Sequence, residues 1–242
     1  MKTCFNQLFP FYPTAYAIGF IKGDPEDVSQ DIFRWRAKLG WKVKLIRPAR
    51  QGLAAGVELL QPLNLARSRE LVIGTTGGKW SAYLANGIWG ADPFPVCSTL
   101  AGVYGHESVA VNYIPRSIDA SNGLGYYFPG GLQIHLGVYD PDSSSHRNCR
   151  RSLWLNSSRG RSRFDHYGTV LPFEEPSNYD AKRIRDRFNP DILNSYLNKM
   201  GIEYFNPEFY AGPNFLIHNT EWDESTIENV GLDDVRRAIS IG

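Results

Sequence analysis

The residues of this sequence with the clearest chemical potential are six arginines gathered in a stretch of seventeen residues that holds no aspartate or glutamate. They are Arg147, Arg150, Arg151, Arg159, Arg161 and Arg163. A guanidinium group matches a phosphate or a carboxylate through two parallel hydrogen bonds, and a ring such as Trp154 can stack on a base or anchor a partner. The stretch is therefore either a binding patch or a solvated sheet edge whose charges discourage strand pairing. The net charge of only +1 favours the edge.

A cysteine nucleophile could be formed by Cys149 with His146, or with the more distant His135 or His166. A catalytic thiol needs a base that lowers its pKa, and the neighbouring arginines would also favour the thiolate. However, no family-specific sequence surrounds Cys149, and a histidine three residues away in a loop is a common coincidence. We therefore predict no catalytic residues.

Metal and cofactor sites are not predicted either. The five histidines never stand at the spacing of two or four residues that is typical of paired metal ligands. Asp140 and Asp142 lack the later ligands and the glycine of a calcium loop. Residues 74–79 have the glycines and the lysine of a phosphate-binding loop, but Trp80 stands where such a loop needs a hydroxyl group. We interpret residues 74–79 as a hairpin turn.

The elements that must position these residues begin with a strand, a helix and a strand. Asp24 can cap a helix over residues 25–39, and Pro25 suits its first position. The apolar residues of this helix recur at spacings of four, three and four, which makes one buried stripe. Residues 15–21 have the pattern of a buried strand, and residues 41–46 that of a half-buried one.

Hairpins and alternating strands dominate the middle of the chain. Residues 70–74 and 80–84 are predicted to pair through a glycine-rich turn, and residues 152–156 and 163–167 through residues 157–160. Further strands are expected at 108–114 and 132–139, and short helices at 53–60 and 95–103.

Helices return toward the C-terminus. Residues 181–188 carry alternating basic side chains, and residues 192–200 follow a cap at Asn189. Glu174 and Glu175 are adjacent and point in different directions, so we expect a salt bridge to the basic helix rather than a pair of catalytic carboxylates. Residues 221–241 are acidic and are expected to be helical after Glu224.

This order of elements predicts an α+β fold, with a mostly antiparallel sheet and helices packed on it. We expect a single domain over residues 1–242, or two tightly joined halves at 1–68 and 69–220, with an acidic tail at 221–242.

Composition narrows the class of protein further. The chain has 242 residues, of which 42% are hydrophobic and 13% aromatic, so global disorder is excluded. Its three cysteines are far apart, which argues against a disulfide framework. The N-terminal residues lack the uninterrupted apolar run of a secretory signal, and no window is apolar enough for a membrane helix. We expect a cytoplasmic protein with no cofactor and no membrane partner.

Several short segments carry a resemblance to a family. They are Lys79-Trp80-Ser81-Ala82-Tyr83, Pro172-Phe173-Glu174-Glu175-Pro176, Arg183-Ile184-Arg185-Asp186-Arg187-Phe188 and Phe205-Asn206-Pro207-Glu208-Phe209-Tyr210. With them, residues 70–212 resemble a group of uncharacterised bacterial proteins. In general character such proteins are similar to the immunity partners of bacterial toxins, and the resemblance implies no catalytic residues.

These observations predict a binding protein, namely an immunity protein that neutralises a cognate toxin by direct protein–protein contact. The sequence offers no coherent catalytic set, and tyrosine, tryptophan and arginine are the residues that interfaces favour. The candidate contact residues are Arg150, Arg151, Trp154, Arg161 and Arg163 in the hairpin, and Asp223, Glu224 and Glu228 in the tail, which could mimic phosphate if the toxin is a nuclease. The alternative is an enzyme or a nucleic-acid- or nucleotide-binding factor that holds phosphate with the patch at residues 147–163.

Overall fold

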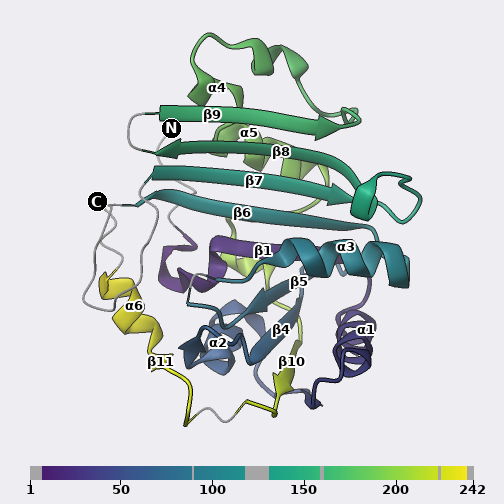
Figure 1. Cartoon of the computed structure of the whole chain (residues 1–242), viewed down its shortest axis with the longest axis vertical. Coiled ribbons are helices and arrows are strands. Elements are labelled where there is room, and N and C mark those ends of the chain that lie inside the picture. The colour runs from purple at the N-terminus through teal and green to yellow at the C-terminus, as the bar shows by residue number, and fades with distance from the viewer. Residues whose placement is uncertain (1–6, 89, 118–130, 159–160, 223–224, 239–242) are drawn as a thin grey trace.

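One nine-stranded antiparallel sheet organises the computed structural model, which describes residues 7–88, 90–117, 131–158, 161–222 and 225–238 (Figure 1). In spatial order its strands are β2 (Val43–Ile46), β10 (Asn214–Asn219), β4 (Arg69–Gly74), β5 (Trp80–Ala85), β1 (Ala17–Lys22), β6 (Ser108–Ser117), β7 (Gly131–Tyr139), β8 (Cys149–Ser158) and β9 (Arg161–Gly168). The helices are α1 (Pro25–Lys38), α2 (Gly52–Leu60), α3 (Pro93–Tyr104), α4 (Ile184–Arg187), α5 (Pro190–Lys199) and α6 (Leu232–Ala238). A separate two-stranded sheet joins β3 (Leu63–Asn64) to β11 (Asn229–Val230). The predicted α+β class is confirmed.

The centre of the sheet is a β-α-β-β-α-β unit made by β1, α1, β4, β5, α3 and β6. Its strands lie in the order β4-β5-β1-β6, and each adjacent pair is antiparallel. This is the strand order of the split β-α-β motif, with β2, α2 and β3 inserted before β4. The sheet is then extended by β10 and β2 at one edge and by β7, β8 and β9 at the other. Strands from residues 1–68 and from residues 69–220 therefore share one sheet.

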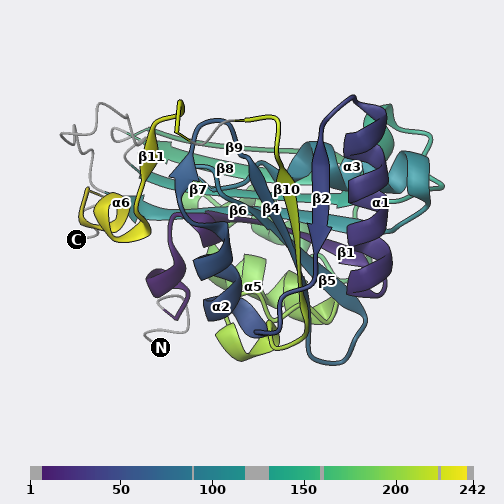
Figure 2. The ribbon, with the colours of Figure 1, turned by 90° about the horizontal axis from the view of Figure 1, so that it is seen from below.

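Helices cover both faces of the sheet (Figure 2). We call the face that carries α1 and α3 the front, and the opposite face the back. On the front face, Val28 and Ile32 of α1 and Leu100 of α3 form one apolar cluster with strand residues such as Tyr83. On the back face, α2, α5 and the segment that follows α5 form a larger cluster that runs from β4 to β8. The front face is covered only as far as α3 reaches, and this difference leaves the front of β7–β9 exposed.

The two helices of the central unit begin in the same way. The Asp24 carboxylate accepts a hydrogen bond from the Glu26 amide at 2.8 Å, and Asp92 caps α3 through the Phe94 amide at 3.3 Å. A proline occupies the first helical position in each, where its missing amide hydrogen costs nothing. The predicted helix over 25–39 is confirmed, and so are the helices at 53–60 and 95–103. Both predicted hairpins are confirmed by their strand registers.

The expected C-terminal helices are wrong in part. Of residues 181–188, only Ile184–Arg187 are helical, and α4 buries no residue, so it has no apolar stripe to stabilise a longer helix. The helix expected after Glu224 is limited to α6, because residues 229–230 pair with β3 instead.

Strand β10 was not predicted at all. It lies between β2 and β4, and its residues Phe215, Leu216 and Ile217 are buried. Phe215 and Ile217 face the front cluster, whereas Leu216 belongs to the back one. A short apolar run buried on both faces shows no alternation, so periodicity could not distinguish it from a turn of helix.

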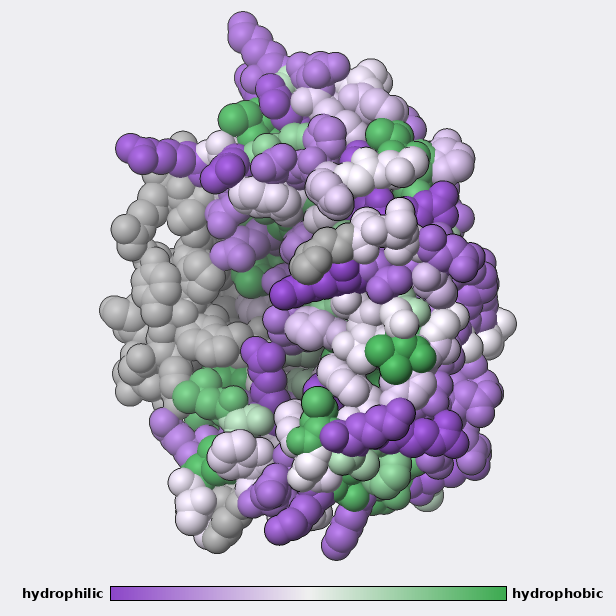
Figure 3. All heavy atoms as spheres, turned by 45° about the vertical axis from the view of Figure 1, so that its right-hand side comes forward, coloured by the Kyte–Doolittle hydropathy of each residue, from purple (hydrophilic) through white to green (hydrophobic). Residues whose placement is uncertain are grey.

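Hydrophilic residues dominate the side of the molecule shown in Figure 3, where hydrophobic residues form small separate groups. Large exposed apolar patches are the mark of obligate interfaces, and this side carries none among the residues shown in colour. Within the described ranges, every helix is too short or too polar to cross a lipid bilayer.

Candidate binding surface

The front of β7, β8 and β9 forms an exposed surface beside α3, which we call the open face. Cross-strand register places nine side chains on it. They are Gln133 and His135 of β7, Ser152, Trp154 and Asn156 of β8, and Arg161, Arg163, Asp165 and Tyr167 of β9. The alternate residues of the same strands, such as Leu153 and Leu155, are buried in the back core. The open face is thus the solvent side of a half-covered antiparallel sheet.

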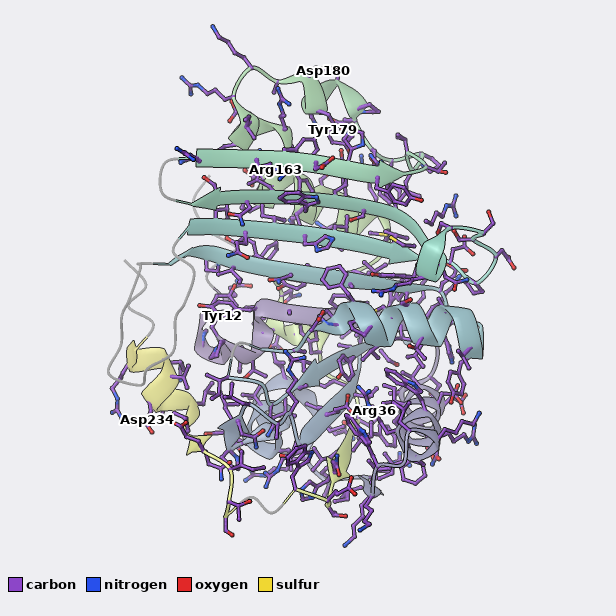
Figure 4. The ribbon with its side chains drawn as sticks, in the orientation of Figure 1. Tyr12, Arg36, Arg163, Tyr179, Asp180 and Asp234 are labelled. Carbon is purple, nitrogen blue, oxygen red and sulfur yellow. The ribbon has the colours of Figure 1, made fainter. Side chains whose placement is uncertain are left out.

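An aromatic and cationic pair stands at the centre of the open face. His135, Trp154 and Asp165 are direct neighbours across the three strands. The Arg163 guanidinium carbon lies 5.2 Å from the centre of the Trp154 ring, a cation–π distance, and Arg163 lies 4.0 Å from the Asp165 carboxylate (Figure 4). The Arg163 side chain is 75% exposed, so its charge remains available to a partner.

His135 is held as a neutral ring. It stacks on Phe94 of α3 with ring centres 4.0 Å apart, and its Nε2 lies 3.0 Å from the Ser152 hydroxyl oxygen. Burial lowers the pKa of His135 from 6.5 to about 4. At neutral pH this histidine is a flat, uncharged part of the surface and not a proton carrier for catalysis.

A groove of about 970 Å³ lies where the open face meets α3. Asp92, Phe94, Pro95, Ser98 and Thr99 line it from the helix side, and Tyr139, Arg147, Cys149 and Tyr167 from the sheet side. Tyr167 is 59% exposed at its mouth. The volume is within the range of clefts that take a ligand or an anchoring side chain.

The cysteine nucleophile that was considered from the sequence, and not predicted, is not assembled among the described residues. Burial raises the pKa of the Cys149 thiol, and its Sγ lies 3.5 Å from the Arg151 carbonyl oxygen. His166 of β9 stands opposite Leu153 in the strand register, so its side chain points to the back of the sheet. The side chain of His146 is outside the described residues. Cys149 therefore contributes to the wall of the groove as a thiol.

The predicted arginine patch is divided by the structure. Arg151 points to the back of β8 and is 1% exposed, which corrects its assignment as a contact residue. Arg150 lies beside a register shift at the end of β8, where it pairs with Asp140 at 3.0 Å. Only Trp154, Arg161 and Arg163 of the predicted hairpin contacts share the open face.

Arg151 and Glu174 form a buried ion pair. Arg151 Nε and Nη2 donate to the Glu174 carboxylate at 2.9 and 2.6 Å, and Arg151 Nη1 donates to the Gly168 carbonyl at 3.1 Å. Glu174 also accepts hydrogen bonds from the Leu171 amide at 3.0 Å and from the Tyr179 hydroxyl at 2.5 Å. Burial alone lowers the pKa of Arg151, but the bonds to Glu174 raise it overall, so the guanidinium stays charged. The prediction that this acidic pair forms a salt bridge to residues 182–187 is therefore wrong. Glu174 pairs with Arg151, and Glu175 lies 3.9 Å from the Lys199 ammonium of α5.

The described acids of the C-terminal tail lie away from the open face. Asp223 and Glu224 lie outside the described residues, and Glu228 is exposed next to β11. Two later acids form ion pairs within α6, Asp233 with Arg236 at 2.8 Å and Asp234 with Arg237 at 2.5 Å. Asp234 and α6 lie at the other end of the molecule from β9 (Figures 1 and 4).

Sequence reasoning missed Phe94 and Tyr167, which border the groove. The alternation of β9 could have identified Tyr167. Tyr167 follows Asp165 by two residues and Arg163 by four, so the three side chains must share one face of the strand. Phe94 carried no such signal, because its place beside His135 depends on how α3 packs on the sheet.

The described residues contain no group of three or more histidine, cysteine or acidic side chains arranged to hold a metal ion. Comparisons of the chain with protein-family models, with curated proteins and with solved structures find no match. The open face and its groove are therefore identified by their geometry alone, as a candidate binding surface on an α+β scaffold.

The buried ion pair makes a first prediction, about stability. Arg151→Met leaves a buried carboxylate without its cation and is expected to lower the free energy of unfolding by about 3–5 kcal/mol in urea titrations. Adding Glu174→Gln should recover part of this loss, since no buried charge then stays unpaired. Arg163→Met, at an exposed arginine, is the control and should change stability by less than about 0.5 kcal/mol. A cost for Arg151→Met as small as that of the control would contradict the structural role.

A second prediction concerns pH. Because the pKa of folded His135 is about 4 and that of a free histidine 6.5, the unfolded chain binds more protons between these values. The stability contributed by neutral His135 is complete above pH 6.5 and is lost as pH falls toward 4. The difference in unfolding free energy between the wild type and His135→Gln should therefore shrink by about 1–3 kcal/mol from pH 7 to pH 4. An NMR titration of the His135 ring with a midpoint near 6.5 would show that the ring is not buried as described.

Proposed function

We propose that this protein is a binding protein that recognises a protein partner through the open face, and that it neutralises a cognate bacterial toxin in the manner of an immunity protein. The observation that carries the proposal is that exposed Arg163 and Tyr167 share the open face with half-buried Trp154, beside a groove of about 970 Å³. Tryptophan, tyrosine and arginine are the residue types that dominate the binding energy of protein interfaces.

The arrangement of these residues suits a preformed interface. Arg163 lies over the Trp154 ring, and Phe94 is stacked on His135, so both aromatic groups are ordered before a partner arrives. Ordering side chains in advance reduces the entropy that association must overcome. The groove can then receive a protruding side chain of the partner, in the way that buried anchors occupy pockets at interfaces.

The resemblance to immunity proteins supports the choice of partner. Two of the four segments that carry it contact the strands of the open face, because Glu174 binds Arg151 behind β8 and α4 packs against β9.

The test is co-expression with the product of the neighbouring gene, followed by growth assays and size-exclusion chromatography. We expect a stable complex and rescue of growth. Trp154→Ala combined with Arg163→Glu should weaken the complex at least about tenfold, because it removes two central anchors. Lys44→Glu, on the opposite edge strand β2, is the matched charge reversal and should leave the complex intact. If the protein rescues growth from none of the adjacent gene products, the proposed immunity function is refuted. If the double variant still forms the complex, the assignment of the open face as the binding surface is refuted.

A second candidate function is single-stranded nucleic acid binding, and the charge of the β9 edge favours it. Arg161 lies on β9, and α4, which directly follows Lys182 and Arg183 in the chain, packs against that strand. Within the described part of the chain, Arg161, Lys182 and Arg183 have no carboxylate partner. Arg185 Nε reaches across to the Ser162 hydroxyl of β9 at 3.3 Å. A row of cations beside exposed aromatic rings is the arrangement that tracks a phosphate backbone and stacks bases.

This second candidate makes its own prediction. A labelled oligouridylate should bind at low salt with an affinity that falls steeply as salt is added, as followed by fluorescence anisotropy. Arg161→Glu with Arg163→Glu should weaken that binding by about tenfold or more, since two phosphate contacts are reversed. Unchanged binding by the double variant, or no binding at low salt, would eliminate the nucleic acid function and leave the protein partner.

A further inference from the structure

A second pocket, of about 370 Å³, lies at one end of strands β5, β6, β7 and β8 on the back of the sheet. Its lining residues are Lys79, Trp80, Glu107, Ser108, Val109, Val138, Tyr139, Asp140, Arg150, Leu171, Pro172, Phe173 and Met200. Val109 and Val138 belong to the back core, so this pocket opens away from the open face and does not depend on the proposed partner.

The floor of the pocket is apolar and is fixed by hydrogen bonds that need no ligand. Trp80 Nε1 donates to the Met200 carbonyl at 3.1 Å, and Lys199 Nζ donates to the Phe173 carbonyl at 3.2 Å. The wall at Leu171 is tied down through its amide, which donates to the buried Glu174 carboxylate. A preformed apolar concavity with a few polar groups at its rim is the usual form of a small-ligand site.

The rim carries four charged side chains, and three of them are neutralised within the protein. Glu107 pairs with Lys22 at 2.7 Å, and Asp140 pairs with Arg150 at 3.0 Å. Lys79 is different, because among the described residues no carboxylate pairs with it. Its ammonium group lies 5.7 Å from the centre of the Trp80 ring, and both residues line the pocket. The pocket therefore offers one available positive charge above an apolar floor.

We infer that this pocket binds a small carboxylate with an apolar body. The apolar group would occupy the floor between Trp80 and Phe173, and the carboxylate would face Lys79. A cationic ligand is disfavoured, because both acids at this rim are already paired. A phosphate group is disfavoured as well, because the pocket offers it a single cation and apolar walls. The same chemistry is presented by a free aryl or branched-chain acid and by the C-terminal residue of a peptide.

The experiment compares acids with their uncharged amides by isothermal titration calorimetry. 3-Phenylpropionate should bind, and 3-phenylpropionamide should bind at least about fivefold more weakly, since it lacks the charge-assisted contact. Lys79→Met should remove this difference by weakening the acid alone, because Lys79 is an exposed turn residue whose replacement leaves the floor intact. Lys42→Met, at an exposed lysine just before β2, is the matched control and should bind both probes as the wild type does.

Two further titrations, one with a variant of the pocket floor and one with a second acid, locate the ligand and identify its source. Phe173→Ala should weaken the acid and the amide alike, because it removes part of the floor that both share. N-Acetylphenylalanine reports on a peptide terminus, so tighter binding than that of 3-phenylpropionate indicates a chain end, and weaker binding a free acid. The inference is overturned if acid and amide bind equally, if Lys79→Met binds the acid like the wild type, if Phe173→Ala changes neither affinity, or if neither acid binds.

Discussion

The buried pair of Arg151 and Glu174 is the interaction on which the organisation of the surfaces depends. It joins the back of β8 to the segment from Leu171 to Tyr179, which has little regular structure of its own. Two desolvated charges are tolerable only when each is paired and hydrogen-bonded, and here both conditions are met. Because this segment closes the back of β8, the front of the same strand can remain exposed without opening the core.

The alternation of strand residues explains why the described arginines of the 147–163 stretch, which leave out Arg159, do not share one surface. Arg151 faces the core, whereas Arg161 and Arg163 face solvent on β9. Successive side chains of a strand point to opposite faces, so a dense run of one residue type is divided between two environments. The sequence allowed two interpretations of this stretch, a charged sheet edge or a binding patch, and both can hold. Strand β9 is an edge strand, and its charged side chains also border the open face.

Much of the fold could be predicted because local signals agreed with the final packing. Asp24 and Pro25 began α1 as expected, and the turn residues between β4 and β5 marked a hairpin. The basic segment at 181–188 was misread, because alternating charges resemble a helix face while no apolar stripe supports it. The site was harder to predict, since the groove is formed by α3, β7, β8 and β9, and Phe94 reaches His135 only through the tertiary fold.

The composition of the open face favours recognition over mere solvation. An antiparallel sheet can leave one face in water if the residues on that face are polar, and Gln133 and Asn156 meet this requirement. Trp154 and Tyr167 do not, because each leaves apolar surface in contact with water that a serine or a threonine would avoid. Arg163 covers part of the Trp154 ring but keeps its own charge exposed. A face that solvation alone had shaped would not need aromatic rings held in place at its centre, whereas a face that binds a partner does.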